Sequence, residues 1–259
     1  MQTKASDKEI QSANMLKARM SANNKALKDF DEWCFQQIPE ISLHGKVLDL
    51  GCGNGKQLHL FSRIFSDKST FFGLDLSNDS LQDLRSSYQS PPELQLVEGS
   101  FDMLDSLKEL EGFSFDLIYA AYALYYTKDL KKLIKDVYDL LKPGGIFWVI
   151  GPDSGTNQEF LNIIRPLHEV EDFMDYVFDR FMPEVVELGT QQGFNSIKPS
   201  MLRNKVFFPS ADAFMAYLSN SLFYRPGYDE EIKGQVQAVI DREGVFAVSK
   251  HIMSIQLRK

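Results

Sequence analysis

The sequence predicts an α/β protein built on a doubly wound, mostly parallel seven-stranded sheet, with N-terminal helices and an inserted helical cap. Three observations predict this fold class. Short apolar segments alternate with helical patterns from residue 46 to about residue 150, and this alternation is typical of a parallel sheet with helices on both faces. A glycine-rich turn follows the first apolar segment. The length of 259 residues suits one large domain or one domain with a cap.

The first half of the chain supplies five expected strands and four expected helices. Apolar runs predict strands over 46–50, 70–76, 94–98, 115–121 and 145–151. Helical spacing of apolar residues predicts helices over 55–65, 78–88, 103–110 and 128–141. The last of these is the most amphipathic, and Pro143 with the two glycines after it gives a strong stop signal.

The flanking segments have a different character. One or two amphipathic helices are expected between Ala13 and Ile41, packed over the ligand edge of the sheet. Residues 158–187 are rich in Phe, Met and Val at helical spacing, which predicts the helical cap. A strand is expected over 197–208, followed by a helix capped by Ser210 that runs to Leu222, a helix over 229–242 and a last strand over 246–257.

These elements predict four regions. We expect an N-terminal helical segment over 1–40, a cofactor-binding core over 41–152 and a helical cap or substrate segment over 153–195. Residues 196–259 are expected to form a strand pair with inserted helices that completes the same domain as the core.

Composition argues against several functions. The net charge of −8 disfavours a grip on nucleic-acid phosphates, and no apolar run reaches the length that spans a bilayer. The N-terminus lacks a secretory apolar segment, so we expect a cytoplasmic protein. The two cysteines, Cys34 and Cys52, form no disulfide framework. The four scattered histidines match no metal-ligand spacing, so we expect no metal.

The turn in KVLDLGCGNGKQLHL is the main chemical signal. Gly51, Gly53 and Gly55 stand between the first strand and the first helix. Three glycines in one turn indicate a backbone with φ > 0 or the close approach of another group. The carboxyl ends of strands in open α/β sheets bind ligands. The third glycine comes one position too early for the dinucleotide pattern, and the P-loop spacing is absent.

Four ordered motifs resemble the class I S-adenosylmethionine-dependent methyltransferases, of small-molecule type. VLDLGCGNG is similar to the family's first motif, and FFGLDLS places an acidic residue at the end of the second strand. FDLIYAAYALYY resembles the fourth motif, and LKPGGIFWV resembles the segment before the fifth strand. The resemblance covers residues 40–152 in detail, and it implies a Rossmann-like methyltransferase fold.

The resemblance also implies a cofactor site for S-adenosyl-L-methionine, with S-adenosyl-L-homocysteine as the product. Asp75 is expected to accept hydrogen bonds from the ribose hydroxyls, and Asp49 to lie near the methionine amino group or to organise the turn. Ser100 stands where the family commonly has an acidic residue, so Ser100 or the Phe101 backbone, or alternatively Asp102, is expected to meet the adenine. The implied cofactor-binding residues are Asp49, Gly51, Cys52, Gly53, Asp75, Leu76, Ser100, Phe101 and Ala120.

The catalytic residues are not identified by the sequence. Tyr125 aligns by resemblance with a position that faces the sulfonium, and His168 is the sole histidine of the expected cap. Tyr119 and Tyr122 are interpreted as an aromatic wall of the core. Because the chain lacks the Asn-Pro-Pro-Tyr pattern and a catalytic cysteine pair, we expect transfer to an O or N atom of a small molecule such as a sugar or secondary metabolite.

Two other functions stay open at this point. The chain is also compatible with a regulatory protein that binds the cofactor without turnover. Methylation of protein or RNA is a third possibility, although the acidic charge and the absence of a basic stripe count against RNA. The sequence leaves the oligomeric state open, and it indicates neither a nucleic-acid partner nor a membrane.

Overall fold

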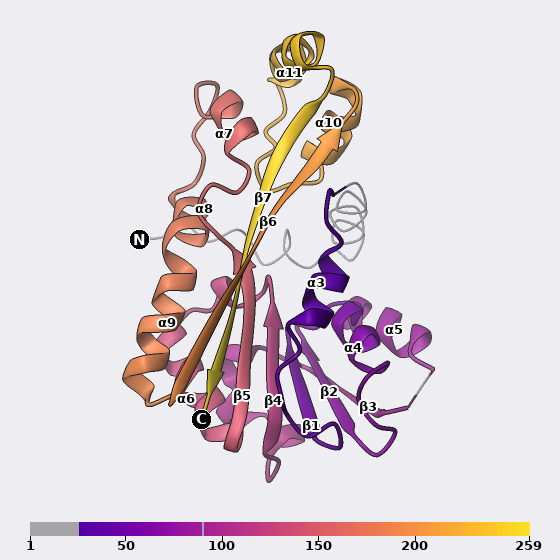
Figure 1. Cartoon of the computed structure of the whole chain (residues 1–259), viewed down its shortest axis with the longest axis vertical. Helices are drawn as coiled ribbons and strands as arrows, with labels where there is room; N and C mark the ends of the chain where they lie inside the picture. The colour runs from indigo at the N-terminus through magenta and orange to yellow at the C-terminus, as the bar shows by residue number, and fades with distance from the viewer. Residues whose placement is uncertain (1–25, 90) are drawn as a thin grey trace. The chain divides into compact units, whose positions relative to one another are not determined.

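The structure is a computed structural model that describes residues 26–89 and 91–259. Seven strands form one sheet in the order β3-β2-β1-β4-β5-β7-β6, drawn in Figure 1. The strands are β1 (Lys46–Leu50), β2 (Thr70–Asp75), β3 (Glu93–Glu98), β4 (Phe115–Ala121), β5 (Leu141–Pro152), β6 (Ser196–Phe208) and β7 (Phe246–Arg258). The first five pair in parallel, and β6 and β7 make an antiparallel hairpin. The expected fold class is therefore confirmed.

The helices follow the strands along the chain as the alternating pattern predicts. They are α3 (Phe30–Gln36), α4 (Lys56–Phe61), α5 (Asn78–Ser87), α6 (Leu130–Leu140), α7 (Gln158–Ile164), α8 (Asp172–Asp175), α9 (Phe181–Gln192), α10 (Ala211–Leu218) and α11 (Asp229–Glu243). Shorter helical turns are η1 (Phe101–Ser106), η2 (Lys108–Leu110), η3 (Leu124–Tyr126) and the π-helical η4 (Tyr176–Arg180). Among the described residues, no helix has the length and apolarity needed to cross a bilayer.

The described chain divides into two compact units. The core unit comprises Phe35–Gly151, Arg180–Ser200 and Met253–Lys259. The second unit comprises the described residues up to Cys34 together with Pro152–Asp179 and Met201–Ile252. Both strands of the β6–β7 hairpin contribute residues to both units.

Several element boundaries follow local side-chain chemistry. Ser77 Oγ accepts from the backbone N–H of Ser80 and caps α5, and Ser210 caps α10 in the same way. Such caps satisfy N–H groups that the first turn of a helix leaves without an intrahelical partner. Asp129 accepts from the Lys132 N–H at 2.9 Å and begins α6. The expected helix starts therefore hold to within a residue or two for these three helices.

Several sequence-based boundaries are wrong. The helix expected over 55–65 ends at Phe61, and the helix expected to run to Leu222 ends at Leu218. The helix expected over 103–110 is replaced by the short turns η1 and η2. Leu107 between them is extended and packs against Gly99, so a tertiary contact interrupts the helical pattern. The strand expected from residue 145 begins at Leu141, which pairs with Phe115 across an irregularity in the β4–β5 register.

The N-terminal expectation is tested only in part. Residues 13–25 of the expected helical segment lie outside the described residues. Within the described part α3 is a helix, and the packing of this segment over the ligand edge stays a prediction. The helical character expected over 158–187 is confirmed, in four pieces rather than one.

An aromatic cluster fixes the helix that follows the glycine turn. Phe61 of α4, Tyr119 of β4 and Trp148 of β5 are fully buried. The Phe61 and Tyr119 rings meet edge to face with centroids 5.1 Å apart, and those of Tyr119 and Trp148 are 4.9 Å apart. Each such pair contributes about 0.5–1.5 kcal/mol beyond its buried area. Trp148 Nε1 also donates to Ser254 Oγ at 2.7 Å, so the buried indole is satisfied.

Candidate functional site

The turn between β1 and α4 has the backbone that its glycines predict. Gly51, Gly53 and Gly55 have φ of 71°, 53° and 75°, all in the left-handed region. A Cβ on Gly51 would lie 2.5 Å from the Cβ of Ala123, and one on Gly55 would lie 2.2 Å from Leu84 Cδ1. The turn is therefore packed between the segment after β4 and the helix α5, and both its conformation and its surroundings require glycine.

Backbone hydrogen bonds hold this turn against the end of β2. The N–H groups of Gly51 and Cys52 both donate to the Leu74 carbonyl, at 2.8 and 3.0 Å, and the Gly55 N–H donates to the Cys52 carbonyl at 2.9 Å. The Cys52 side chain is buried, and burial raises the pKa of its thiol. The Cys52 thiol is therefore not a reactive thiolate, and only the backbone of this residue is suited to contact a ligand.

Asp75 joins the two strand ends. Its Oδ2 accepts from the Gly53 N–H at 2.8 Å, and its Oδ1 accepts from the Ser77 N–H at 2.8 Å. Because Ser77 caps α5, Asp75 is not the helix cap. Burial raises the pKa of the Asp75 carboxyl, and the N–H groups of Ser77 and Gly53 oppose that rise. Each carboxylate oxygen has a second lone pair, so Asp75 can still accept from a ligand.

Asp49 is a buried carboxyl with an unmet hydrogen-bonding need. The side chain is 1% exposed, and among the described residues no group hydrogen-bonds to its Oδ2. Burial raises the pKa of Asp49 well above its ordinary value, and the nearby charge of Asp75 raises it further. A buried polar atom of this kind is costly without a partner. The position therefore suits a ligand that brings a positive charge or an N–H donor.

The loop after β3 uses two of its polar side chains internally. Ser100 Oγ accepts from the Asp102 N–H at 3.1 Å and caps η1. The Asp102 carboxylate accepts from the Thr127 hydroxyl and from the Lys128 N–H. Asp102 thus fastens the loop after β3 to the loop after β4. Of the three candidates for the adenine contact, only the Phe101 backbone is not engaged by these side-chain bonds, and the choice among the three stays a prediction.

Exposed apolar side chains follow three of the parallel strands, β2, β3 and β4, of which β2 and β4 flank β1. Leu76 after β2 is 48% exposed, Met103 after β3 is 52% exposed, and Tyr122 after β4 is 39% exposed. The carboxyl ends of parallel strands lie at one edge of a sheet, so these residues line the edge that holds the glycine turn. Sequence reasoning named Leu76 and missed Met103, for which the sequence carries no evident signal.

Tyr122 does not belong to the core, and the interpretation of it as a core wall is wrong. Tyr119 is fully buried as expected, but Tyr122 is exposed and has φ of 54°. Its N–H donates to the Ile150 carbonyl at 2.9 Å, so β4 ends and the chain turns at this residue. A bulky side chain in the left-handed region is uncommon, and strained backbone of this kind clusters at functional sites.

The two catalytic candidates lie in different units. Tyr125 is in η3 of the core unit, where its ring meets Phe181 of α9 edge to face at 5.6 Å and Tyr126 at 4.6 Å. Ala120, two residues before Tyr122, is buried in β4. His168 belongs to the second unit and lines a pocket there. Among the described residues, no group of three or more His, Cys, Asp and Glu side chains is arranged to hold a metal ion.

Known proteins are similar to this chain over the region of the glycine turn. Residues 48–149 match the protein family described as "Methyltransferase domain". The chain is 34% identical over 134 residues to a trans-aconitate 2-methyltransferase of Deinococcus radiodurans, covering 52% of this chain and 48% of that protein. It is also 34% identical over 155 residues to a sterol 24-C-methyltransferase of Debaryomyces hansenii, covering 56% of this chain and 39% of that protein. The chain thus spans less than half the length of either relative.

Solved structures share the fold. The YcgJ protein from Bacillus subtilis has a TM-score of 0.59 at 16% identity, covering 88% of this chain and 97% of that one. A phosphoethanolamine N-methyltransferase 2 of Haemonchus contortus, in complex with S-adenosyl-L-methionine, has a TM-score of 0.57 at 15% identity, covering 96% of this chain and 57% of that one. The matched region of the family begins within β1 and ends within β5, so it contains the glycine turn and both carboxylates.

Proposed function

We propose that the chain is a class I S-adenosylmethionine-dependent methyltransferase that moves a methyl group from S-adenosyl-L-methionine to an O or N atom of a small molecule. The match of residues 48–149 to the methyltransferase domain family supports this proposal. S-adenosyl-L-homocysteine is then the product. The observation that carries the proposal is the pairing of a bare, left-handed glycine turn with two carboxyls, the buried Asp49 and the partly buried Asp75.

Each part of this site has a role suited to the cofactor. The backbone at Gly51 and Gly53 lets the methionyl portion lie close to the main chain. Asp49 Oδ2 receives the amino group, which supplies the donor that the buried oxygen otherwise lacks among the described residues. Asp75 keeps its bonds to Gly53 and Ser77 and accepts the ribose hydroxyls on its remaining lone pairs. Leu76 covers one face of the adenine, and the edge of the ring meets Ser100 or the Phe101 backbone.

The bound cofactor supplies an activated methyl group on a positively charged sulfur. The chain's own contribution is to position the acceptor and to keep water out, since the leaving group needs no further activation. Tyr122 and Met103 provide exposed apolar surface at the same edge, and Tyr125 presents its ring beside Phe181. A base for the acceptor's proton is not obligatory.

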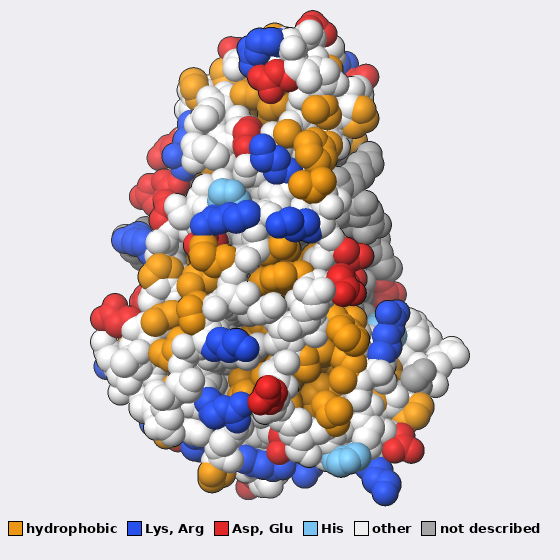
Figure 2. Space-filling model, in the orientation of Figure 1, with side chains coloured by type: hydrophobic (Ala, Val, Ile, Leu, Met, Phe, Trp, Pro, Cys, Tyr) orange, Lys and Arg blue, Asp and Glu red, His pale blue; other side chains and the backbone are white. Residues whose placement is uncertain are grey.

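A small-molecule acceptor is supported by charge and by the relatives. The net charge of −8 disfavours a polyanionic substrate. On the face drawn in Figure 2, basic and acidic side chains are interspersed rather than gathered into a basic stripe. The two relatives described above are named for aconitate and sterol substrates.

A second candidate is transfer to carbon. The relative from Debaryomyces hansenii is named a 24-C-methyltransferase. Carbon acceptors need an activated double bond or carbanion and a site with little water, and the apolar residues Leu76, Met103 and Tyr122 suit such a site as well.

One experiment separates these functions. The full chain is incubated with S-adenosyl-L-methionine labelled with ¹³C on the methyl group and with a fractionated metabolite extract. Methyl carbons on oxygen, nitrogen and carbon differ clearly in ¹³C chemical shift, so the product spectrum names the acceptor atom. A Gly53→Val variant serves as the control for background transfer. Label found in macromolecules alone would contradict the proposal, and tight cofactor binding without any product would favour a regulatory protein.

A further inference from the structure

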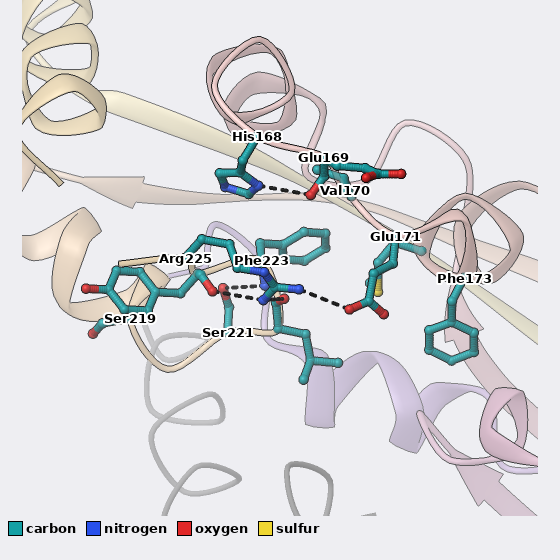
Figure 3. A pocket seen from close by; sticks show the side chains of 12 residues that line it. His168, Glu169, Val170, Glu171, Phe173, Ser219, Ser221, Phe223 and Arg225 are labelled. Atoms are coloured by element: carbon teal, nitrogen blue, oxygen red, sulfur yellow. Dashed lines mark hydrogen bonds and ion pairs between the residues drawn. The ribbon is translucent and has the colours of Figure 1, made fainter. Parts of the chain in front are cut away.

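The second unit contains a pocket of its own, shown in Figure 3. Two loops form it. One precedes α8 and carries His168 and Glu171, and the other lies between α10 and α11 and carries Arg225. The volume is about 180 Å³. A dry apolar cavity of about 150 Å³ holds benzene, so this pocket has room for one small ring.

His168 presents one unsatisfied nitrogen in this pocket. Its Nδ1 lies 3.0 Å from the Glu169 carbonyl oxygen, which can only accept, so Nδ1 carries the proton. In the neutral ring Nε2 is then an acceptor. This Nε2 is buried, and among the described residues no group hydrogen-bonds to it. The ring packs against Tyr228 with centroids 5.4 Å apart, which fixes its orientation.

Two of the three charged residues that line the pocket, Arg225 and Glu171, form an ion pair, and the third, Glu169, is exposed. Arg225 Nη2 lies 3.0 Å from Glu171 Oε1, and Arg225 Nη1 donates to the carbonyls of Tyr224 at 3.0 Å and Leu222 at 3.3 Å. In Figure 3 the His168 ring points from its loop toward the loop of Arg225, and the Arg225–Glu171 pair bridges the two loops. A ligand with a full charge would compete with this ion pair, so a neutral ligand is favoured.

The apolar part of the lining suits an aromatic ring. The apolar side chains are Val170, Phe173, Met174, Leu222 and Phe223, and Glu169, Ser219, Ser221 and Tyr224 add polar groups beside them. Methionine sulfur and aromatic edges make favourable contacts with a ring. Small-molecule sites commonly combine such a lining with a few placed polar groups.

We propose that this pocket binds a compact, neutral aromatic molecule that carries a hydroxyl group, with the hydroxyl donating its hydrogen to His168 Nε2. This inference goes beyond methyl transfer and does not depend on it, because it rests on the second unit alone.

The test uses the full chain without cofactor and the probes phenol and toluene, which differ in the hydroxyl group. Ligand-observed saturation-transfer NMR gives both affinities, and ¹⁵N spectra of the histidine rings report on Nε2. Phenol is expected to bind about tenfold more tightly than toluene and to shift the His168 Nε2 resonance. Equal affinity for the two probes, or an unmoved Nε2 resonance at saturating phenol, would overturn the proposal.

Three variants locate the binding. His168→Phe is expected to abolish the preference for phenol, whereas the matched control His44→Phe, at an exposed histidine of the core unit, keeps it. Leu222→Trp fills the pocket, so it is expected to weaken both probes; it also tests the site if His168→Phe does not fold. A phenol preference that survives in both pocket variants would refute the assignment. If the chain binds S-adenosyl-L-methionine but not phenol, this inference fails and the proposed methyltransferase function stands. If it binds phenol but not S-adenosyl-L-methionine, the methyltransferase function fails and this inference stands.

Discussion

The backbone N–H of Gly53 donates to Asp75 Oδ2 across 2.8 Å, although the two residues are 22 positions apart. The carboxylate at the end of β2 therefore holds the turn at the end of β1. The same side chain is the one we propose for the ribose hydroxyls. Shape of the turn and recognition of the cofactor are thus linked through one residue.

This link predicts the effect of removing the Asp75 carboxylate. Asp75→Ala loses hydrogen bonds to a charged acceptor, each of which is worth about 1.5–3 kcal/mol. We expect S-adenosyl-L-methionine affinity to fall at least about tenfold in isothermal titration calorimetry. Asp67→Ala, at an exposed aspartate of the same unit, is the matched control and should bind as the wild type does. Unchanged affinity in Asp75→Ala would remove the ribose assignment.

Asp49 predicts an unusual dependence of stability on pH. Burial, and secondly the charge of Asp75, raises the pKa of Asp49 well above its ordinary value of 3.8. The folded protein therefore keeps this proton over a pH range in which the unfolded chain has released it. The contribution of Asp49 to stability must fall as the pH rises from about 3.8 through the raised pKa.

The variant Asp49→Asn tests that dependence, because asparagine does not ionise. Urea titrations without cofactor between about pH 4 and pH 9 give the free energy of unfolding of both proteins. The value for the variant minus the value for the wild type should increase as the pH rises. The variant should also bind S-adenosyl-L-methionine more weakly, since it lacks the negative charge proposed for the amino group. A constant difference in stability at all pH values would show that Asp49 is not perturbed by burial.

Substitutions at Gly51 and Gly112 separate the cost of a steric clash from the cost of a strained backbone conformation. Gly51 and Gly112 both have positive φ, of 71° and 77°, but a Cβ on Gly51 meets Ala123 at 2.5 Å whereas one on Gly112 meets nothing within 4 Å. Gly112→Ala should cost about 1 kcal/mol of unfolding free energy, from backbone strain alone. Gly51→Ala should cost about 1–3 kcal/mol more, because overpacking is added. If urea unfolding shows the same loss of unfolding free energy in both variants, Ala123 moves aside at little energetic cost.

Tyr122 predicts a conflict between stability and activity. Its left-handed backbone costs on the order of 1–3 kcal/mol, and glycine adopts that conformation without a Cβ penalty. Tyr122→Gly should therefore leave the free energy of unfolding unchanged or raise it by about 1 kcal/mol, while kcat/KM for methyl transfer falls. Full activity in the Tyr122→Gly variant would show that the exposed tyrosine ring does not contact the cofactor or the acceptor.

Tyr125 allows its hydroxyl to be separated from its ring. Tyr125→Phe keeps the edge-to-face packing on Phe181, so the thermal midpoint should change little. If the hydroxyl contacts the transferring methyl group or the acceptor, kcat falls, by about tenfold for one lost hydrogen bond. Stability that falls together with kcat would indicate a packing role instead.

Much of the site was predictable because its residues stand close together in sequence. The three glycines of the turn, Asp49 before them and the Ser77 cap of α5 are local features, and local chemistry dictates their conformation. The exclusion of Asp75 from capping α5 was likewise predictable from the better placement of Ser77.

Other features depend on contacts between distant segments. The burial of Asp49 next to Asp75, the exposure of Tyr122 and the closeness of Ala123 to Gly51 arise where β1, β2 and β4 meet at one edge. The turns η1 and η2 stand where a helix was expected, and the extended Leu107 between them lies against Gly99.

The sequence by itself determined most of the strands and helices and the left-handed turn, because hydrophobic periodicity and glycine act over short distances along the chain. Only the tertiary structure decided which carboxyl oxygen lacks a hydrogen-bond donor among the described residues, which tyrosine is strained and exposed, and which histidine nitrogen is buried. Burial and hydrogen-bond satisfaction depend on neighbours that are far apart in sequence.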